Sequence, residues 1–344
     1  MAALTSSVLS SSVLSSSSTL SLLPGSSGPA RYATLGLDLT GLGVRTDDLS
    51  DELPVEKADL ARIASYTRAA HQAGVGLVCL DEAFRLRSDH AVRHHDWLDP
   101  LVAARRLAPH ASAGLIAALP AGFDPDVIDG ELTRAPHDRR TWTGLQVTGA
   151  DAARLATRRR PTRTRPSRVV LALSGESDVE LAGRYADVVR LREADPQRAR
   201  QLRDAVRAEA RSAGRKGAVT VLADVHTVVS SDRASAAERA ALVADIAGEQ
   251  APWTGALTAY GTVADVADLL QAWLEAGAAD GFVALPGSLP ADVAGLVRGV
   301  VPELRKRGVL EDRPTAPVVS APAAPAATET TSARARLRRA AAVA

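Results

Sequence analysis

The chain has very little cysteine and very few aromatic residues. Of its 344 residues one is a cysteine, Cys79, and 3% are aromatic, although 46% are hydrophobic. A single cysteine excludes an internal disulfide framework and agrees with a reducing cytoplasm as the location. The hydrophobic fraction is large enough for a sizeable core. That core must therefore be built mainly from alanine, valine and leucine.

The sequence also lacks a long apolar run and an excess of charge of either sign. No stretch approaches the roughly 20 apolar residues that cross a bilayer. The 41 basic and 40 acidic residues leave a formal net charge of +1. We therefore expect neither a membrane nor nucleic acid as a partner. Arginines do gather between Arg158 and Arg168. We interpret this run as a solvated loop, with an anion site as the alternative.

Two tails of low complexity flank the rest of the chain. Residues 1–30 are rich in serine and leucine, and the first basic residue is Arg31, so the charged start of a secretory signal is missing. Residues 313–344 consist mainly of alanine, proline, threonine and arginine. Neither tail can bury enough side-chain surface to offset the entropy lost on folding. We therefore expect two disordered tails around one domain at 31–312.

Within that domain, apolar strand-like runs alternate with amphipathic helical segments. The candidate strands are Ala33–Leu39, Val75–Asp81, Ser112–Ala118, Trp142–Thr148, Arg168–Leu173, Ala186–Leu191, Val219–Val229 and Gly281–Leu285. The candidate helices are Val55–Gln72, Leu98–Leu107, Pro125–Ala135, Pro196–Ala213, Ala234–Ala247, Val263–Ala276 and Pro290–Lys306. Near-continuous apolar runs are typical of parallel strands that are buried on both faces. The pattern predicts an α/β fold with a mostly parallel sheet, but periodicity does not separate a barrel from an open sheet.

Four blocks of sequence are similar to one known family. They are Leu35-Gly-Leu-Asp-Leu-Thr-Gly41; Leu98–Pro109 with the strand Gly114–Ala118; Asp138-Arg-Arg-Thr-Trp142 with Val147-Thr148; and a long C-terminal block. The last block contains Tyr260-Gly-Thr262, Asp265-Val-Ala-Asp-Leu-Leu270, Trp273, Gly277-Ala-Ala-Asp-Gly-Phe282, Pro286, Leu289-Pro290 and Val301-Pro-Glu-Leu-Arg-Lys-Arg-Gly308. Together they resemble the luciferase-like, flavin-dependent monooxygenases, in the branch of the nitrilotriacetate and alkanesulfonate monooxygenases. The C-terminal block is the most specific of the four.

This resemblance implies a single (β/α)8 TIM barrel with its active site at the carboxyl ends of the strands. It also implies an oxidoreductase that uses reduced FMN from a separate flavin reductase, together with O2 and a small organic substrate. The flavin would carry the chemistry, while the protein binds it and keeps water away. A homodimer or tetramer is implied as well. Two alternatives stay open: a barrel that binds a partner without turnover, and an enzyme that uses the deazaflavin F420.

The resemblance suggests where the cofactor phosphate would bind. The segment Ala172-Leu-Ser-Gly-Glu-Ser177 follows the fifth candidate strand, and small residues at the start of a helix leave backbone N–H groups free for an anion. Ser174, Gly175 and Ser177 are the candidates for this contact. Against it, Ser177 and Asp178 fit a helix N-cap, and the charge of Glu176 would repel a phosphate.

Two further residues are cofactor candidates by the same resemblance. Thr148, at the end of the fourth candidate strand, matches a hydroxyl near the flavin, and Trp142 fits a wall beside the ring. Each also has an ordinary structural interpretation. Threonine is common at strand ends, where it bonds to the following turn, and a large aromatic side chain in an aromatic-poor chain more often belongs to the core.

Ionisable residues at strand ends offer no clear catalytic set. Asp38 and Thr40 end the first candidate strand, and Asp81 and Glu82 end the second. If buried, the paired carboxylates would suit acid–base work, but helix capping and solvation explain them more simply. His90, His94 and His95 fit a solvated loop better than a metal site. The sequence therefore predicts no metal and leaves the catalytic residues unassigned.

Two departures from the family pattern bear on activity. After the third candidate strand the family usually carries hydroxyls and a histidine, whereas this chain reads Ala117-Ala-Leu-Pro-Ala-Gly-Phe-Asp-Pro125. Gly122 or Phe123 stands in place of the histidine. The long segment that covers the substrate after the fourth strand is reduced to Gly149–Ser167. The missing covering segment predicts a wetter pocket, and both changes favour the alternative of a barrel without turnover.

Overall fold

A computed structural model gives the fold of the central part of the chain. It describes residues 32–42, 60–84, 99–111, 113–120, 122–133, 142–158, 167–173, 175–215, 217–248, 251 and 253–311. Both predicted tails lie outside these residues, as do His90, His94, His95 and most of the arginine run after Arg158. No helix in the described ranges is both long and apolar enough to cross a membrane.

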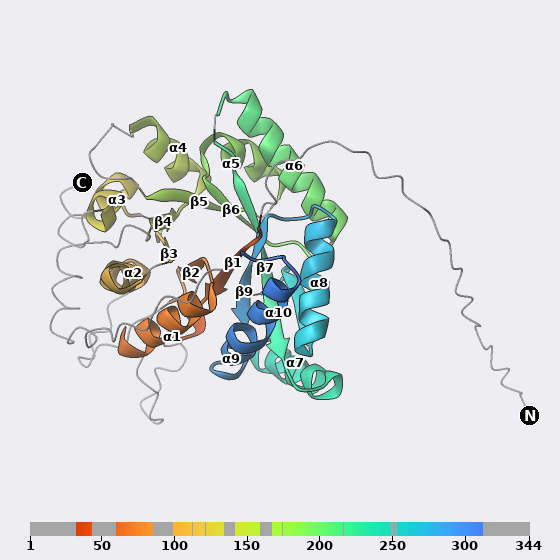
Figure 1. Ribbon diagram of the computed structural model, residues 1–344. Helices are drawn as coiled ribbons and strands as arrows, with labels where there is room; N and C mark the ends of the chain where they lie inside the picture. Colours follow the sequence, from red (N-terminus) through yellow and green to blue (C-terminus); the bar gives the residue numbers. More distant parts are fainter. Residues whose placement is uncertain are drawn as a thin grey trace, which may run out of the picture. The chain divides into compact units, whose positions relative to one another are not determined.

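Parallel strands form the centre of the molecule (Figure 1). Their bounds are β1 Thr34–Asp38, β2 Leu77–Leu80, β3 Gly114–Ala118, β4 Trp142–Gln146, β5 Arg168–Leu173, β6 Val188–Leu191, β7 Thr220–Val229, β8 Leu257–Gly261 and β9 Gly281–Pro286. β1 to β7 pair in sequence order, β7 pairs with β9, and β9 pairs with β1. Eight strands therefore close a barrel, and β8 lies beside the upper half of β7, outside the ring.

Helices surround this ring and follow the strands along the chain (Figure 1). Their bounds are α1 Leu60–Ala73, α2 Asp99–Leu107, α3 Pro125–Thr133, α4 Gly149–Arg158, α5 Val179–Tyr185, α6 Pro196–Ser212, α7 Arg233–Ala247, α8 Val263–Glu275, α9 Ala291–Gly295 and α10 Val301–Lys306. A π-helical turn, Leu296–Val300, joins α9 to α10. The (β/α)8 barrel predicted from the resemblance is confirmed.

The strands were predicted more completely than the helices. All eight candidate strands correspond to the eight strands of the ring, with ends that differ by at most two residues. β8 was not predicted, because the alternating buried and exposed residues of this strand differ from the continuous apolar runs of the ring strands. The helix α4 and the short α5 were not predicted either. Gly149–Ser167, which we interpreted as a reduced connection, begins with the ten-residue helix α4.

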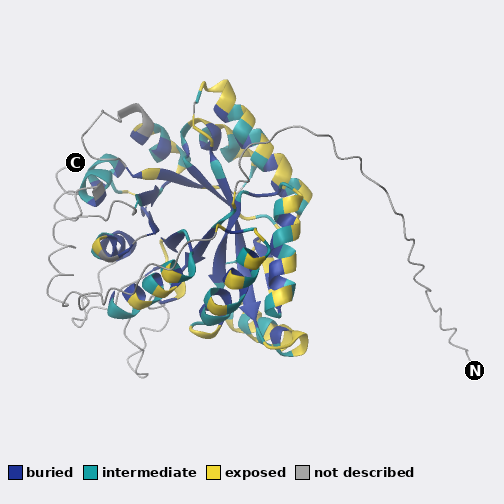
Figure 2. Ribbon diagram, in the orientation of Figure 1, coloured by how far each residue is buried: buried dark blue, intermediate teal, exposed yellow. Residues whose placement is uncertain are grey.

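Two apolar layers hold the barrel together, and they follow from the alternation of side chains along each strand. The outer layer packs the strands against the helices, most of which have exposed residues on their outward faces (Figure 2). The inner layer contains Cys79, Ile116, Val170, Leu222 and Val283, among other residues that point into the barrel. The interior is thus a packed core in its lower half, as expected for a barrel of this size.

Glycine allows close strand contact on the inner side of β9. Gly281 pairs with Thr34 of β1, and a Cβ atom at position 281 would lie 1.9 Å from the carbonyl oxygen of Thr34. We expect Gly281→Ala to lower the free energy of unfolding by about 2 kcal/mol, because the two strands must separate. Urea denaturation followed by circular dichroism would measure this loss.

Gly130→Ala is the matched control for this prediction. Gly130 lies within α3, and a Cβ atom there would meet nothing within 4 Å. The same substitution should therefore stabilise the protein by about 0.5–1 kcal/mol through helix propensity. Equal effects of the two variants would contradict the close contact between β1 and β9.

Candidate functional site

A buried ion cluster fills the barrel interior above the apolar layer. Arg190 of β6 is 2% exposed, and its Nε donates to Oδ1 of Asp224 at 2.9 Å. Its Nη2 donates to Oδ2 of Asp224 at 3.0 Å and to Oδ2 of Asp38 at 3.1 Å. Asp38 is the last residue of β1, and Asp224 lies within β7. The two carboxyl groups contact Arg190 from different strands. The alternation of each strand turns all three side chains inward.

Three further side chains extend this cluster toward the carboxyl ends of the strands. Nη1 of Arg190 donates to Oε1 of Gln146 at 3.2 Å, and Nε2 of Gln146 donates to Oδ1 of Asp81 at 3.3 Å. Arg192, which is 37% exposed, donates from Nε to Oδ2 of Asp224 at 3.2 Å. Its Nη2 lies 3.6 Å from Oδ2 of Asp81. The network therefore connects the buried interior with the open end of the barrel.

Burial and pairing act in opposite directions on the groups of this cluster. Burial disfavours the charged guanidinium of Arg190, yet its carboxylate partners, with Asp224 first, hold its pKa well above the usual value. Burial raises the pKa of Asp38, and the nearby charge of Asp81 adds to this effect, while Arg190 opposes it. Asp224 takes two of the hydrogen bonds of Arg190 and Asp38 only one. Asp38 is therefore the carboxyl group of this cluster whose pKa is raised by burial.

A histidine with unsatisfied nitrogens lies two residues beyond Asp224 on β7. His226 is 2% exposed, and neither Nδ1 nor Nε2 has a hydrogen-bond partner among the described residues. The indole of Trp253 stacks on its ring, with the centroids 3.9 Å apart and the planes 3° from parallel. Burial lowers the pKa of His226 to about 4, although Asp292 opposes the shift. At neutral pH this side chain is an uncharged imidazole with a free donor and a free acceptor.

The sheet around β7 explains why this histidine lies at the mouth of the barrel. His226 pairs with Thr258 of β8, and Val228 pairs with Tyr260. Neighbouring residues of parallel strands share a face, so Thr258 and Tyr260 lie on the same side as the inward-facing Asp224 and His226. Tyr260 is 53% exposed. The inner face of β8 is thus open to solvent above the ion cluster, and it carries an aromatic side chain.

The loop proposed for the phosphate lies at the same end of the barrel, after β5. Gly175 and Ser177 are on the protein surface, while Ser174 lies outside the described residues. A Cβ atom at Gly175 would meet nothing within 4 Å. Glu176, which we expected to repel a phosphate, is paired with Nη2 of Arg198 at the start of α6. The negative charge of Glu176, which argued against phosphate binding at this loop, is therefore balanced by Arg198.

Two other predicted residues have structural roles. The Thr148 hydroxyl donates to Oδ2 of Asp151 at 2.8 Å and accepts from the Asp151 backbone N–H at 3.3 Å, so it caps α4. Trp142 begins β4 and therefore lies at the amino end of the barrel, away from the mouth. It packs on the inner apolar layer, and the Arg168 guanidinium carbon lies 4.1 Å from its ring centroid. The core interpretation fits Trp142, and we do not place it beside a flavin.

Asp38 does act as a cap, because its Oδ1 accepts from the backbone N–H of Thr40 at 2.9 Å, but it is not solvated, because its side chain is buried against Arg190. Asp81 remains half-buried at the edge of the same cluster. The sequence analysis missed Arg190, Asp224 and His226. One signal was available: these ionisable residues interrupt the apolar runs of β6 and β7, and Asp224 and His226 are spaced so that both face one side of a strand.

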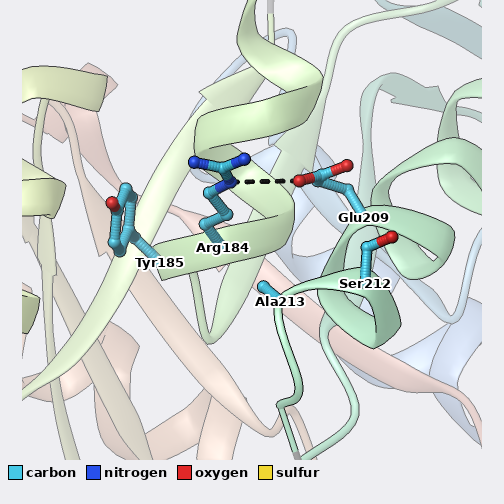
Figure 3. Close-up of a pocket in the computed structure, with 5 residues that line it drawn as sticks. All are labelled: Arg184, Tyr185, Glu209, Ser212 and Ala213. Atoms are coloured by element: carbon cyan, nitrogen blue, oxygen red, sulfur yellow. Dashed lines mark hydrogen bonds and ion pairs between the residues drawn. The ribbon is translucent and has the colours of Figure 1, made fainter.

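A cavity also lies away from the barrel mouth (Figure 3). Its volume is about 620 Å³, and it is lined by Arg184, Tyr185, Glu209, Ser212 and Ala213. Nε of Arg184 donates to Oε1 of Glu209 across it at 3.0 Å. These residues come from the last turns of α5 and α6, which end at the amino side of the barrel. Because barrel enzymes carry their chemistry at the carboxyl side, we do not assign this cavity to the active site.

The described residues fit a flat, phosphate-bearing cofactor at the mouth. Ala172 faces the interior next to Arg190, yet it is exposed, so the barrel is open at the carboxyl end of β5. His226 supplies hydrogen-bonding groups without partners, and Gly175 leaves space for an anion. In the parts of the chain that the structure describes, no group of three or more potential ligands is placed to hold a metal ion.

Comparisons with known proteins identify similar sequences and folds. Residues 138–279 match the family model described as luciferase-like monooxygenase. No sequence among the curated proteins matches the chain. EDTA monooxygenase from Chelativorans sp. BNC1 is structurally similar, with a TM-score of 0.59 and 17% identity, over 90% of this chain and 98% of that one.

Two other solved structures show the range of cofactors on this fold. A riboflavin lyase, determined with modified FMN and riboflavin, has a TM-score of 0.58 and 16% identity over 81% of this chain and 93% of its own. An F420-dependent secondary alcohol dehydrogenase has a TM-score of 0.53 and 11% identity over 78% of this chain and 98% of its own. At such identities these structures show the fold alone. The predicted resemblance is confirmed: the chain is similar to the luciferase-like monooxygenases in sequence over residues 138–279 and in fold over the barrel.

Proposed function

We propose that the protein is an FMN-dependent oxidoreductase that uses reduced flavin and O2 to oxygenate a small organic substrate. The observation that carries this proposal is His226, whose ring nitrogens are buried and unpartnered at the mouth of a barrel that matches a flavin-dependent family. A buried polar group without a partner costs stability. Its presence beside an open, aromatic-lined mouth indicates a ligand that completes its hydrogen bonds.

The chain's own residues have distinct roles in this proposal. Ser174, Gly175 and Ser177 bind the phosphate through the loop after β5, with Arg198 balancing Glu176. The ring system would be held at the open end of the barrel, beside Ala172. Reduced flavin supplies the electrons that activate O2. Arg190 is fixed by its carboxylate partners and holds Asp38 in place, and Asp38 is the group able to keep or release a proton near the reacting atoms.

The rest of the assignment follows from the same proposal. As the resemblance to luciferase-like monooxygenases implies, reduced FMN would come from a separate flavin reductase. We place the enzyme in the cytoplasm, where such reductants are available, as a homodimer or tetramer. F420 is the alternative cofactor, since an F420-dependent dehydrogenase shares this fold. A barrel that binds a partner without turnover is the other alternative, favoured by the missing histidine after β3.

A substitution in the phosphate loop tests the proposal. Ser177→Asp places a negative charge beside the cofactor phosphate, and we expect it to weaken FMN binding by about tenfold or more. Riboflavin, which lacks the phosphate, should bind equally well before and after the change. Fluorescence titration of both flavins measures this, with Ser177→Asn as the uncharged control. Failure of the wild-type protein to bind FMN, with tight binding of F420, would replace FMN by the deazaflavin. Failure to bind either would favour the barrel without turnover.

A further inference from the structure

The charges at the mouth limit what kind of substrate can enter. Two guanidinium groups, Arg190 and Arg192, face three carboxylates, Asp38, Asp81 and Asp224, and every one of these carboxylates lies within 3.6 Å of a guanidinium nitrogen. The positive charges of both arginines are therefore already engaged by carboxyl groups. An incoming organic anion would have to displace Asp81 or Asp224 from Arg192 before it could be paired.

His226 and two further arginines near the mouth supply no free positive charge. His226 is neutral at neutral pH because burial lowers its pKa to about 4. Arg239, near the carboxyl ends of β7 and β9, is held by the buried carboxylate of Asp292, at 2.9 Å from Nη2 to Oδ1. Arg198 is paired with Glu176 at the phosphate loop. An anion at the aromatic side of the mouth would thus find hydrogen-bonding groups but no free cation among these residues.

The remaining contacts suit a substrate with an apolar ring or chain and an uncharged or cationic polar end. Tyr260 and Trp253 present aromatic surface on the inner side of β8 and beside it. Such surfaces bind apolar groups and attract cations. The imidazole of His226 accepts a hydrogen bond from an amide or amine, or donates one to a carbonyl.

Resting on the proposed function, we infer that this mouth selects substrates without negative charge, such as amides and amines, and rejects organic carboxylates of the same shape. The ion cluster would then select substrates by their charge, and we call it a charge filter. Its carboxylates occupy the two guanidinium groups that would otherwise bind an acidic substrate, and Asp81, the most exposed of them, is the residue that sets the preference.

Three probes of similar shape and different charge test this inference. Phenethylamine, phenylacetamide and phenylacetate would each be titrated into the full-length protein at pH 7.5, with binding followed by ligand-observed NMR. We expect the amine and the amide to bind about tenfold or more tightly than the carboxylate. In Asp81→Asn, where Arg192 loses one partner, phenylacetate should gain about tenfold, while phenylacetamide changes little.

Asp204→Asn is the matched control, since Asp204 is an exposed carboxylate on α6, outside the barrel, and the ranking of the probes should persist in it. Binding of phenylacetate to the wild type as tightly as the amine would overturn the inference, and so would failure of both the amine and the amide to bind. FMN titration of the same samples is a separate measurement. If FMN does not bind, the proposed function fails, whereas a wrong probe ranking with intact FMN binding rejects only the charge filter.

Discussion

Arg190→Met is expected to lower the free energy of unfolding by about 3–5 kcal/mol, since it leaves Asp224 and Asp38 buried without their cation. Methionine matches the aliphatic part of the arginine side chain, so the loss reports the charge and its hydrogen bonds more than the volume. Guanidinium chloride denaturation at neutral pH, followed by circular dichroism, measures the change. Because buried carboxylates without a partner take up protons, the loss should shrink as the pH falls.

Replacing the whole cluster separates the contribution of the pair from the cost of breaking it. Charges removed together leave no unpaired group behind, so Arg190→Met combined with Asp224→Leu and Asp38→Leu should recover most of the lost stability. Arg233→Met is the control on the surface: its guanidinium is exposed beside Asp265, and the variant should unfold nearly as the wild type does. A single Arg190→Met variant with unchanged stability would show that the carboxylates are not confined with it in the barrel.

If the apolar triple variant is stable, the cluster must be explained by function. An ion cluster that an apolar core can replace adds little to folding, yet this chain retains three carboxylates and two guanidiniums at the carboxyl end of its barrel. This position is where barrel enzymes bind their substrates. The cluster fixes Asp38 beneath the mouth and occupies Arg192 at its edge. The proposed reaction requires the first effect, a fixed carboxyl group of raised pKa at Asp38. The substrate preference requires the second, an Arg192 guanidinium that is already paired with carboxylates.

The fold could be predicted from the sequence because the strands of a parallel barrel are buried on both faces and therefore appear as continuous apolar runs. Val75–Leu80 and Val169–Leu173 are apolar on both faces, and the helices between such runs follow a different period. Closure of the ring depends on the pairing of β9 with β1, which are more than 200 residues apart. No local pattern specifies that contact. Only the resemblance in the C-terminal block indicated it.

The site was predicted less well, because its parts are separated along the chain. Asp38 and Arg190 meet across the barrel, and neither has a neighbour in sequence that reveals the other. The position of the phosphate loop came from a resemblance, and binding there stays a prediction. The histidines at 90, 94 and 95 drew attention because they are close in sequence. His226 follows Asp224 by two residues in β7, and ionisable residues at this spacing in a strand of otherwise mostly apolar residues indicate enclosed polar side chains.

Acid should destabilise the wild-type protein through His226, and His226→Phe should remove that sensitivity. In the unfolded chain a histidine binds a proton below pH 6.5, whereas in the barrel His226 does so only below about pH 4. Between these values the unfolded state holds more protons, so stability rises with pH. The shift corresponds to about 3 kcal/mol, which is present above pH 6.5 and lost as the pH falls toward 4.

His226→Phe keeps an aromatic ring against Trp253 while it removes both unpartnered nitrogens. We therefore expect the variant to be more stable than the wild type at pH 7 by about 1–2 kcal/mol, and the difference to widen as the pH falls to 4. Denaturation curves from pH 4 to pH 8 measure both effects, and His226→Gln, which has no charged form, should lose the pH dependence without the gain at pH 7. The other acids titrate alike in all three proteins, so the differences isolate this residue. A pH dependence that persists in the phenylalanine variant would mean that the imidazole is charged or solvated, and that no ligand is needed to complete its hydrogen bonds.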